Sequence, residues 1–160
     1  METAYLLLGS KLGDREANLK KAVAQIRTIF SLTSQSAIYI TKAWGKTDQP
    51  DFFNQAVGIQ TAASPLELLR EILAIEQAMG RARQEHWGPR LIDIDILLFG
   101  NQIIEHPRLQ IPHPELVNRR FALVPLAEIA GHVVHPQTNL CIGDQLEVCP
   151  DILPVERWKI

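Results

Sequence analysis

The chain has 160 residues, of which 16 are Lys or Arg and 18 are Asp or Glu, and 46% are hydrophobic. This length suits one domain with a substantial core, so we expect residues 1–160 to form a single domain. A formal net charge of −2 without a run of basic residues argues against a general nucleic-acid binder and against a membrane-surface protein.

The N-terminal residues lack the basic lead and the small-residue cleavage site of a secretory signal, and no apolar stretch approaches the roughly 18 residues of a membrane span. Cys141 and Cys149 show no metal-ligand spacing. A disulfide between them is compatible with the sequence, but reduced thiols are expected. We therefore predict a cytoplasmic protein with no nucleic-acid or membrane partner, and we expect a monomer.

The first half of the chain alternates between strand and helix patterns. Residues 4–8 form an apolar run closed by Gly9-Ser10, which predicts a buried strand. Asp14 is a candidate N-cap, and apolar residues recur after it at helical spacing up to Phe30. Residues 36–41 and 52–61 alternate in polarity and predict two more strands, joined by a loop over 42–51 that is too long for a tight hairpin.

The second half begins with a clear helix start. Ser64, Pro65 and Glu67 have the spacing of an N-cap, a first-turn proline and a capping box, and Gly80 suits the C-terminal cap. Residues 91–99 predict a strand, which we expect to turn at Gly100-Asn101 into a hairpin with residues 102–105. One or two short helices over 114–130 and an added strand over 155–160 are expected after it.

The order strand, helix, strand, strand, helix, strand is that of the ferredoxin-like βαββαβ unit. In this α+β fold, an antiparallel sheet is packed under two helices. We therefore predict a ferredoxin-like sheet with C-terminal additions.

The stretch from Arg81 to Gly100 concentrates charged residues before and within an expected strand. Its odd-numbered residues from 91 to 99, including Asp93 and Asp95, share one parity, and its even-numbered residues are apolar, so both carboxylates should leave the same face. Such a pair, with arginines nearby, suits Mg²⁺ that carries a polyphosphate. The alternative is a half-exposed strand on which the aspartates pair with Arg81, Arg83 or Arg90.

Several motifs resemble those of the 6-hydroxymethyl-7,8-dihydropterin pyrophosphokinases of folate biosynthesis. Residues 86–97, HWGPRLIDIDIL, resemble the family signature, and residues 48–54, DQPDFFN, resemble its pterin loop. Residues 80–83 resemble the lead into its catalytic loop, and RLQIPH at 108–113 and NRRF at 118–121 follow in the family's order. The resemblance covers roughly residues 6–129.

The resemblance implies a Mg-ATP-dependent diphosphotransferase with the ferredoxin-like fold. Such an enzyme moves pyrophosphate from ATP to the hydroxymethyl group of a reduced pterin and releases AMP. By position, Asp93 and Asp95 resemble the two aspartates that hold two Mg²⁺ ions, and Arg81 and Arg90 resemble phosphate-binding arginines. These four residues are the expected catalytic set.

The same resemblance implies two binding groups. The expected ATP-binding residues are Glu76, Arg83, Trp87, Ile96, Arg108, His113 and Arg119. The expected pterin-binding residues are Thr41, Ala43, Trp44, Gly45, Phe52, Asn54 and Phe121. The pterin ring would stack between Phe52 and Phe121 while the Asn54 amide reads its edge.

Each of these residues also has an ordinary structural explanation. Arg83 and Glu76 can be solvated surface charges, Trp87 and the phenylalanines can be packing residues, and His113 can be structural. The chain also departs from the family, because Phe52 stands where some members have tyrosine. Gln84 stands where some have lysine, in a catalytic loop that looks one residue shorter.

Two other functions fit the sequence less well. A kinase that moves only the γ-phosphoryl group would fit a Gly-rich phosphate loop, but the chain has no GxxxxGK[ST] motif. An RNA-recognition sheet would show aromatic residues on adjacent central strands and a basic face, and this acidic chain lacks that pattern.

Overall fold

The computed structural model describes residues 1–41, 51–80 and 91–158. Its main sheet is antiparallel, with the strand order β5-β1-β4-β3-β8, and β2 also pairs with β4. The strands are β1 (Glu2–Ser10), β2 (Ser31–Gln35), β3 (Tyr39–Thr41), β4 (Phe52–Thr61), β5 (Asp93–Phe99) and β8 (Val155–Arg157).

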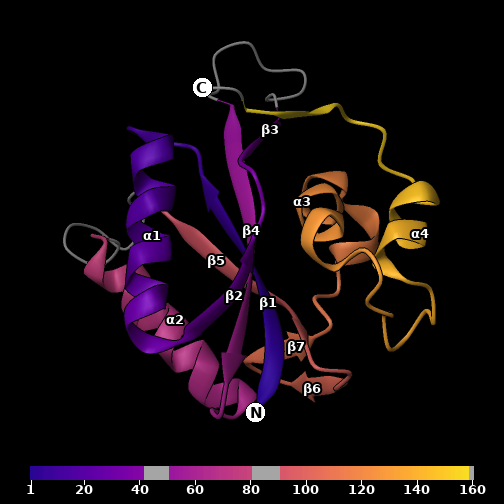
Figure 1. Ribbon diagram of the computed structural model, residues 1–160, viewed down its shortest axis with the longest axis horizontal. Helices are drawn as coiled ribbons and strands as arrows, with labels where there is room; N and C mark the ends of the chain where they lie inside the picture. The colour runs from indigo at the N-terminus through magenta and orange to yellow at the C-terminus, as the bar shows by residue number, and fades with distance from the viewer. Residues whose placement is uncertain (42–50, 81–90, 159–160) are drawn as a thin grey trace.

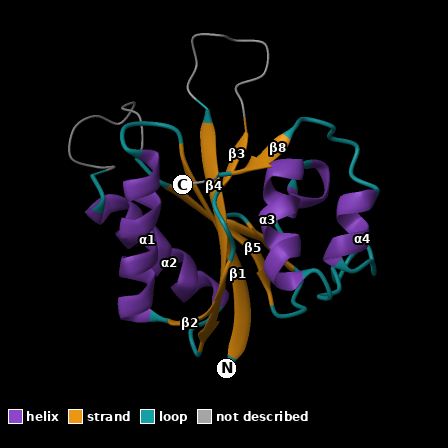
Figure 2. Cartoon of the chain, turned by 45° about the horizontal axis from the view of Figure 1, so that its top comes forward, coloured by secondary structure: helices purple, strands orange, loops and turns teal. Residues whose placement is uncertain are grey.

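Helices cover both faces of this sheet. Figure 1 shows α1 (Arg15–Ile29) and α2 (Pro65–Ala78) on one face and α3 (Arg120–Ala130) with α4 (Ile142–Glu147) on the other. Figure 2 shows the same layers from a second angle, with β8 beside β3. A small ribbon of β6 (Ile104–His106) and β7 (Leu109–Ile111) and a 3-10 turn at Leu116–Asn118 link β5 to α3. The predicted ferredoxin-like α+β fold is confirmed, with α3, α4 and β8 as additions.

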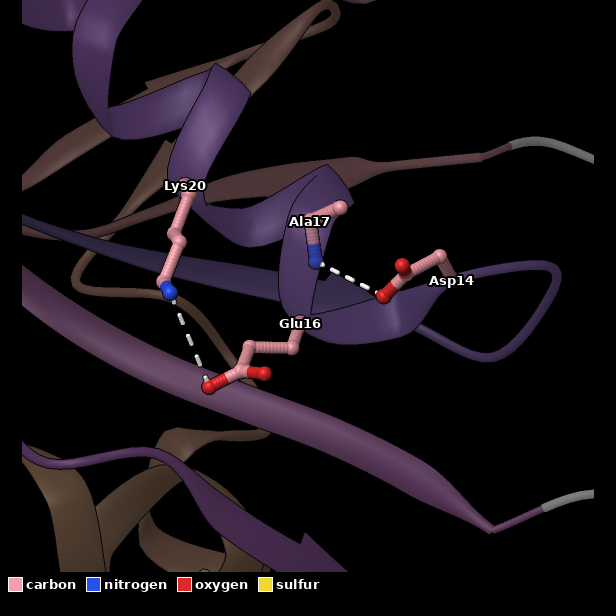
Figure 3. Close-up of polar contacts among 4 residues, drawn as sticks. All are labelled: Asp14, Glu16, Ala17 and Lys20. Atoms are coloured by element: carbon pink, nitrogen blue, oxygen red, sulfur yellow. Dashed lines mark hydrogen bonds and ion pairs between the residues drawn. The ribbon is translucent and has the colours of Figure 1, made fainter. Parts of the chain in front are cut away.

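Local chemistry fixes where the first two helices begin. The carboxylate of Asp14 accepts the backbone N–H of Ala17 at 3.0 Å, and one turn later Lys20 lies 3.8 Å from Glu16 (Figure 3). At the start of α2, the Ser64 and Glu67 side chains each accept the other residue's backbone N–H. Those hydrogen bonds lower the pKa of the Glu67 carboxyl. Both predicted caps are confirmed, and Gly80, at φ 104°, ends the helix as expected.

The core has two parts, one on each side of the sheet. Between the sheet and α1 and α2 lie Leu6 and Leu8 of β1, Val57 of β4, and Ile94 and Ile96 of β5. Between the sheet and α3 and α4 lie the residues that point the other way. They include Leu7, Leu97, Leu98, Leu123, Leu126 and Ile142.

One irregular position on β5 separates the structure from the predicted strand pattern. On β5 the pairing shifts between Ile96 and Leu98, so Leu97 is an extra residue. The shift reverses the alternation, and Phe99 packs in the core beside α1 and α2 instead of sharing the aspartate face. The expectation that residues 91–99 alternate throughout was therefore wrong at its end.

Strand boundaries differ elsewhere too. The polar segment Ser31–Gln35 forms β2, which the sequence pattern did not predict, and regular pairing resumes only at Tyr39. Gly100 and Asn101 do form a turn, but the strand after it pairs with β7 in a separate ribbon, so the expected hairpin with β5 was wrong. Helix α4 was also not predicted, whereas the added strand near residue 155 is confirmed.

No helix within the described ranges is long and apolar enough to cross a membrane.

The pH dependence of stability should report on His135, which is only 2% exposed in the turn between α3 and α4. Its Nδ1 accepts the backbone N–H groups of Gln137 and Thr138 at 3.2 and 3.3 Å, and burial lowers the pKa of the imidazole below 6.5. The folded state therefore holds a neutral ring, whereas the unfolded chain takes up a proton as the pH falls through about 6.5. The free energy of unfolding therefore includes the full contribution of His135 above pH 6.5. As the pH falls from 6.5 to the lowered pKa of the folded state, this contribution decreases by at most about 1.4 kcal/mol per pH unit.

Urea unfolding between pH 8 and pH 5 measures the effect. His135→Asn keeps an acceptor near the Nδ1 position but cannot titrate, so its free energy of unfolding should depend less steeply on pH in this range. Equal slopes for the wild type and the variant would contradict the assignment.

Candidate active site

One row of paired residues crosses five strands of the sheet. Asp93 on β5 pairs with Gly9 on β1, Gly9 pairs with Asn54 on β4, Asn54 pairs with Tyr39 on β3, and Tyr39 pairs with Arg157 on β8. Because directly paired residues of neighbouring strands point to the same face, these side chains leave the sheet together. We call these five residues the site row.

The site row faces α3, not α1 and α2. The sequence neighbours of Asn54 and Asp93, namely Phe53, Ile92 and Ile94, are buried in the core beside α1 and α2. Since side chains alternate along a strand, Asn54 and Asp93 leave by the opposite face. The sheet thus presents an amide and a carboxylate towards the side on which α3 packs.

The lack of a side chain at Gly9 leaves room for the Asn54 amide in the middle of the site row. A Cβ atom built on Gly9 would lie 2.9 Å from Oδ1 of Asn54, which is closer than real Cβ contacts. With two strand spacings between them, the Cα atoms of Asn54 and Asp93 lie about 10 Å apart. The Asn54 amide therefore lies over the backbone of β1, on the Asp93 side of its own strand.

The two aspartates of β5 lie as expected. Asp93 is half-buried and Asp95 is exposed, whereas Ile92, Ile94 and Ile96 between and around them are buried. The prediction that both carboxylates leave one face is confirmed. Asp95 pairs with Leu7, one step along the face from the site row.

The aspartates fit Mg²⁺ in the way that phosphate-bound Mg²⁺ is usually held. Within residues 1–41, 51–80 and 91–158, no group of three or more His, Cys, Asp or Glu is arranged to hold a metal ion alone. Mg²⁺ that carries a polyphosphate, however, is typically bound by one or two carboxylates, with phosphate and water oxygens completing its shell. Two hard oxygen ligands on one face of the strand are compatible with that mode.

Glu76 holds the strand that carries the aspartates. Its side chain is 4% exposed, and its Oε2 accepts the backbone N–H of Ile94, between Asp93 and Asp95, at 2.8 Å. Among the described strands, β5 lies at the edge of the sheet and pairs with β1 alone, so this carboxylate supplies an acceptor for a backbone donor of an edge strand. The sequence signal was the placement of Glu76 four residues after Ile72, on the buried stripe of α2. Its expected nucleotide contact stays a prediction.

A second buried network anchors the chain just before Asp93. The Ser10 hydroxyl donates to the carbonyl oxygen of Leu91 at 2.8 Å and accepts from the Asn18 amide at 3.1 Å. The same amide donates to the carbonyl oxygen of Leu12 at 2.9 Å. The end of β1, the start of α1 and the entry to β5 are therefore tied together, and sequence reasoning missed Ser10 and Asn18.

The expected pterin residues of β3 and β4 lie next to the site row. Phe52 pairs with Thr41, and both are two residues from a member of the row, so they share its face. Phe52 is 37% exposed, and Lys11 Nζ lies 5.6 Å from its ring centroid. Thr41 is buried, and its hydroxyl has no hydrogen-bond partner within the part of the chain that the structure describes. A buried hydroxyl in this state is suited to a ligand.

Phe121 and Arg119 are brought together at the start of α3. The guanidinium carbon of Arg119 lies 5.7 Å from the ring centroid of Phe121, and the ring is partly buried against the core on the α3 side. Phe121 therefore lies on the same side of the sheet as Phe52 and Asn54, as stacking between the two rings requires.

The remaining expected ATP residues are scattered. The side chain of Ile96 packs in the core beside α2, so a contact from it to ATP would come from its backbone. Arg108 is exposed in the turn between β6 and β7. His113 is held beside β5, because its backbone N–H donates to the carbonyl oxygen of Leu97 at 3.0 Å. Its ring Nδ1 accepts the backbone N–H of Glu115.

Seven expected site residues lie outside the described ranges. They are Ala43, Trp44, Gly45, Arg81, Arg83, Trp87 and Arg90. Their roles stay predictions.

Known proteins resemble this chain over most of its length. Residues 5–131 match the model of the 7,8-dihydro-6-hydroxymethylpterin-pyrophosphokinase family, HPPK. A protein of Haemophilus influenzae is 44% identical over 143 residues, which cover 88% of this chain and 89% of the relative. A protein of Methylorubrum extorquens is 46% identical over 136 residues, which cover 84% and 86%. Both are named 2-amino-4-hydroxy-6-hydroxymethyldihydropteridine pyrophosphokinase.

Solved structures share the fold at lower identity. A crystal structure of wild-type HPPK-DHPS of Plasmodium falciparum with SDX-DHP superposes with a TM-score of 0.71 at 18% identity and covers 92% of this chain. Another, of the wild type with pterin and p-hydroxybenzoate, has a TM-score of 0.72 at 19% identity and covers 91%. This chain spans only 43% and 42% of those longer chains. From the match to the family model and the bacterial relatives together, the chain belongs to the 7,8-dihydro-6-hydroxymethylpterin-pyrophosphokinase family.

Proposed function

We propose that this chain transfers pyrophosphate from ATP to the hydroxymethyl group of 6-hydroxymethyl-7,8-dihydropterin, a step of folate biosynthesis. The pterin hydroxyl oxygen forms a bond to the β-phosphorus while the bond from that phosphorus to the α-phosphate oxygen breaks. The products are AMP and the pterin diphosphate. Besides family membership, the observation that carries the proposal is the site row, with Asn54 and Asp93 on either side of Gly9.

In this proposal the pterin lies on the face of the sheet that carries the site row, with its amide edge against the Asn54 side chain. An amide side chain offers both a donor and an acceptor, which matches the mixed edge of the pterin ring. Phe52 and Phe121 stack on its faces, and the hydroxyl of Thr41 gains the partner it lacks among the described residues. The groups of Ala43, Trp44 and Gly45 complete this pocket as predicted from the family. The hydroxymethyl group then points along the site row towards Asp93.

Asp93 and Asp95 are the proposed ligands of two Mg²⁺ ions. Bound there, Mg²⁺ neutralises phosphate charge and lowers the pKa of the attacking hydroxyl. The buried bond from Glu76 and the Ser10 network keep the two carboxylates in place, so little reorganisation is needed when substrates arrive.

The proposed phosphate contacts are cationic and planar. Guanidinium groups match pairs of phosphate oxygens, so Arg81 and Arg90 are proposed to stabilise the transferred group. The proposed nucleotide contacts are Glu76, Arg83, Trp87, Ile96, Arg108, His113 and Arg119. A single catalytic domain, a monomeric state, a cytoplasmic location and the lack of a nucleic-acid partner stay predictions.

The nucleotide product tests the reaction type. Incubation with ATP, Mg²⁺ and 6-hydroxymethyl-7,8-dihydropterin should release AMP in proportion to pterin diphosphate, as resolved by ion-exchange chromatography. ADP without AMP would mean that only the γ-phosphoryl group moves, and the proposal would fail.

Neutralising either aspartate should abolish turnover without unfolding the chain. Asp93→Asn and Asp95→Asn keep the side-chain size but remove a charge that holds Mg²⁺. The bound ion stabilises the transition state by several kcal/mol. We expect kcat to fall about a hundredfold or more, with melting temperatures by circular dichroism close to that of the wild type.

The matched control is Asp144→Asn, which changes an exposed carboxylate on α4. It should leave kcat unchanged. Wild-type turnover in either the Asp93 or the Asp95 variant would remove that residue from the metal site.

Adding one methyl group at Gly9 should weaken pterin binding selectively. In Gly9→Ala the new Cβ displaces the Asn54 amide and occupies the middle of the site row. We expect KM for the pterin to rise about tenfold, or roughly 1.4 kcal/mol, with KM for ATP within about twofold of the wild type.

Gly143→Ala on α4 is the control, because its Cβ would lie 3.4 Å from the carbonyl oxygen of Gly131, a contact that small shifts relieve. It should change neither KM. An unchanged pterin KM in Gly9→Ala would show that the position of the Asn54 amide does not determine pterin binding.

A further inference from the structure

One hydrogen bond links α3 directly to the strand beside Asn54. The Tyr39 hydroxyl donates to Oε1 of Glu128 at 2.6 Å, and the two residues are 89 positions apart. Tyr39 belongs to the site row, where it pairs with Asn54. Glu128 lies on α3, seven residues after Phe121.

The spacing of Phe121 and Glu128 places them on one stripe of the helix. Seven residues make about two turns, so the two side chains leave α3 in similar directions, roughly 10 Å apart along its axis. The hydrogen bond at Glu128 therefore constrains the distance of α3 from the sheet and the rotation of α3 about its axis. Both determine where the Phe121 ring lies.

The Glu128 carboxylate also anchors residues Ser36–Ile38, which form the break in regular pairing between β2 and β3. Both of its oxygens lie 3.2 Å from the backbone N–H of Ala37, which donates to them. On the β4 side, the backbone N–H of Ser36 donates to the carbonyl oxygen of Ala56, and the Ser36 hydroxyl accepts the backbone N–H of Ala56. The Gln55 amide donates to the carbonyl oxygen of Ser36. The break is thus held from α3 and from β4 together.

This break determines which residues of β3 face the site. Gln35 pairs with Val57 and Tyr39 pairs with Asn54, so three residues of one strand oppose two of the other. Without the extra residue, the register of β2 would place Ile38 opposite Asn54. Because a shift of one residue moves every side chain to the other face, Tyr39 and Thr41 would then point into the core beside α1 and α2.

The hydrogen bond between Tyr39 and Glu128 should persist at neutral pH. Burial first, and then the bond to Glu128, raise the pKa of Tyr39 to about 12, so the hydroxyl remains a donor at neutral pH. A hydroxyl that donates to a carboxylate at this distance forms one of the stronger hydrogen bonds of proteins. The carboxylate is exposed, however, so water screens part of its strength.

We propose that Tyr39 and Glu128 are positioning residues for the pterin, which hold the Phe121 stripe of α3 and the face of β3 at a fixed separation. Neither residue needs to touch the ligand. They set the gap between Phe121 on one side and Phe52 and Asn54 on the other. This inference rests on the proposed pterin site, and it adds two residues that the family motifs in the sequence did not indicate.

Pterin affinity in three variants tests the proposal. Tyr39→Phe removes the donor, and Glu128→Ala removes the acceptor for both Tyr39 and Ala37. Glu128→Gln keeps a carbonyl acceptor. Calorimetric titration with 6-hydroxymethyl-7,8-dihydropterin, in the presence of Mg²⁺ and a non-hydrolysable ATP analogue, measures the Kd for each.

We expect Tyr39→Phe to weaken pterin binding about fivefold, and Glu128→Ala about tenfold because it also releases Ala37. Glu128→Gln should recover most of the affinity. The double variant Tyr39→Phe with Glu128→Ala should bind no more weakly than Glu128→Ala alone, since both changes break one tie. The Kd of the ATP analogue, measured separately, should stay within about twofold of the wild type.

Thr138→Val is the control for general destabilisation. It removes another hydroxyl bond, from Thr138 to Gln145 of α4 at 2.7 Å, on the same side of the sheet. It should leave the pterin Kd unchanged even if it lowers the melting temperature as much as Tyr39→Phe does.

Three outcomes would overturn the inference. They are an unchanged pterin Kd in Tyr39→Phe and Glu128→Ala, an equal loss of ATP and pterin affinity, and a loss of pterin affinity in Thr138→Val that matches Tyr39→Phe. A wild-type chain that binds the pterin but releases no AMP would contradict the proposed function alone.

Discussion

Antiparallel pairing across five strands is the constraint on which the candidate site depends. It aligns Asp93, Gly9, Asn54, Tyr39 and Arg157 in one row, although these residues come from five separate parts of the chain. Backbone hydrogen bonds set this alignment, so the strand register determines the separation between the amide and the carboxylate. Gly9 then leaves room for the Asn54 amide over β1, which a residue with a side chain would not do.

The opposite face of the same strands supplies the rigidity. Phe53, Ile92 and Ile94 are buried beside α1 and α2, so the neighbouring polar residues have no freedom to turn inward. The edge strand β5 needs more support, because β1 is its only partner among the strands that the structure describes. The buried carboxylate of Glu76 and the Ser10 network provide that support from helix α2 and strand β1. Such buried bonds are costly to break, which keeps the aspartates in position.

Much of the fold was predictable, and the exceptions share a physical cause. The caps at Asp14 and Ser64, the strand from Phe52 to Thr61 and the shared face of Asp93 and Asp95 all follow from local chemistry and periodicity. The extra residue at Leu97 and the break at Ser36–Ile38 were not predictable in this way. An extra residue on one strand is defined only by its partner strand, so a single segment carries little trace of it. The same holds for β2, whose polar sequence forms a strand because β4 offers it an edge.

The sequence by itself determined the family, the order of the βαββαβ unit and the identity of the residues expected at the site. It did so because motifs such as DQPDFFN and RLIDID are local, and their chemistry can be read without knowing their neighbours. Only the tertiary structure decided that Asn54 and Asp93 share a row with Gly9 between them, and that Glu128 of α3 holds Tyr39 beside that row. These relations join segments dozens of residues apart, and they exist only once strand pairing and helix packing have set the register.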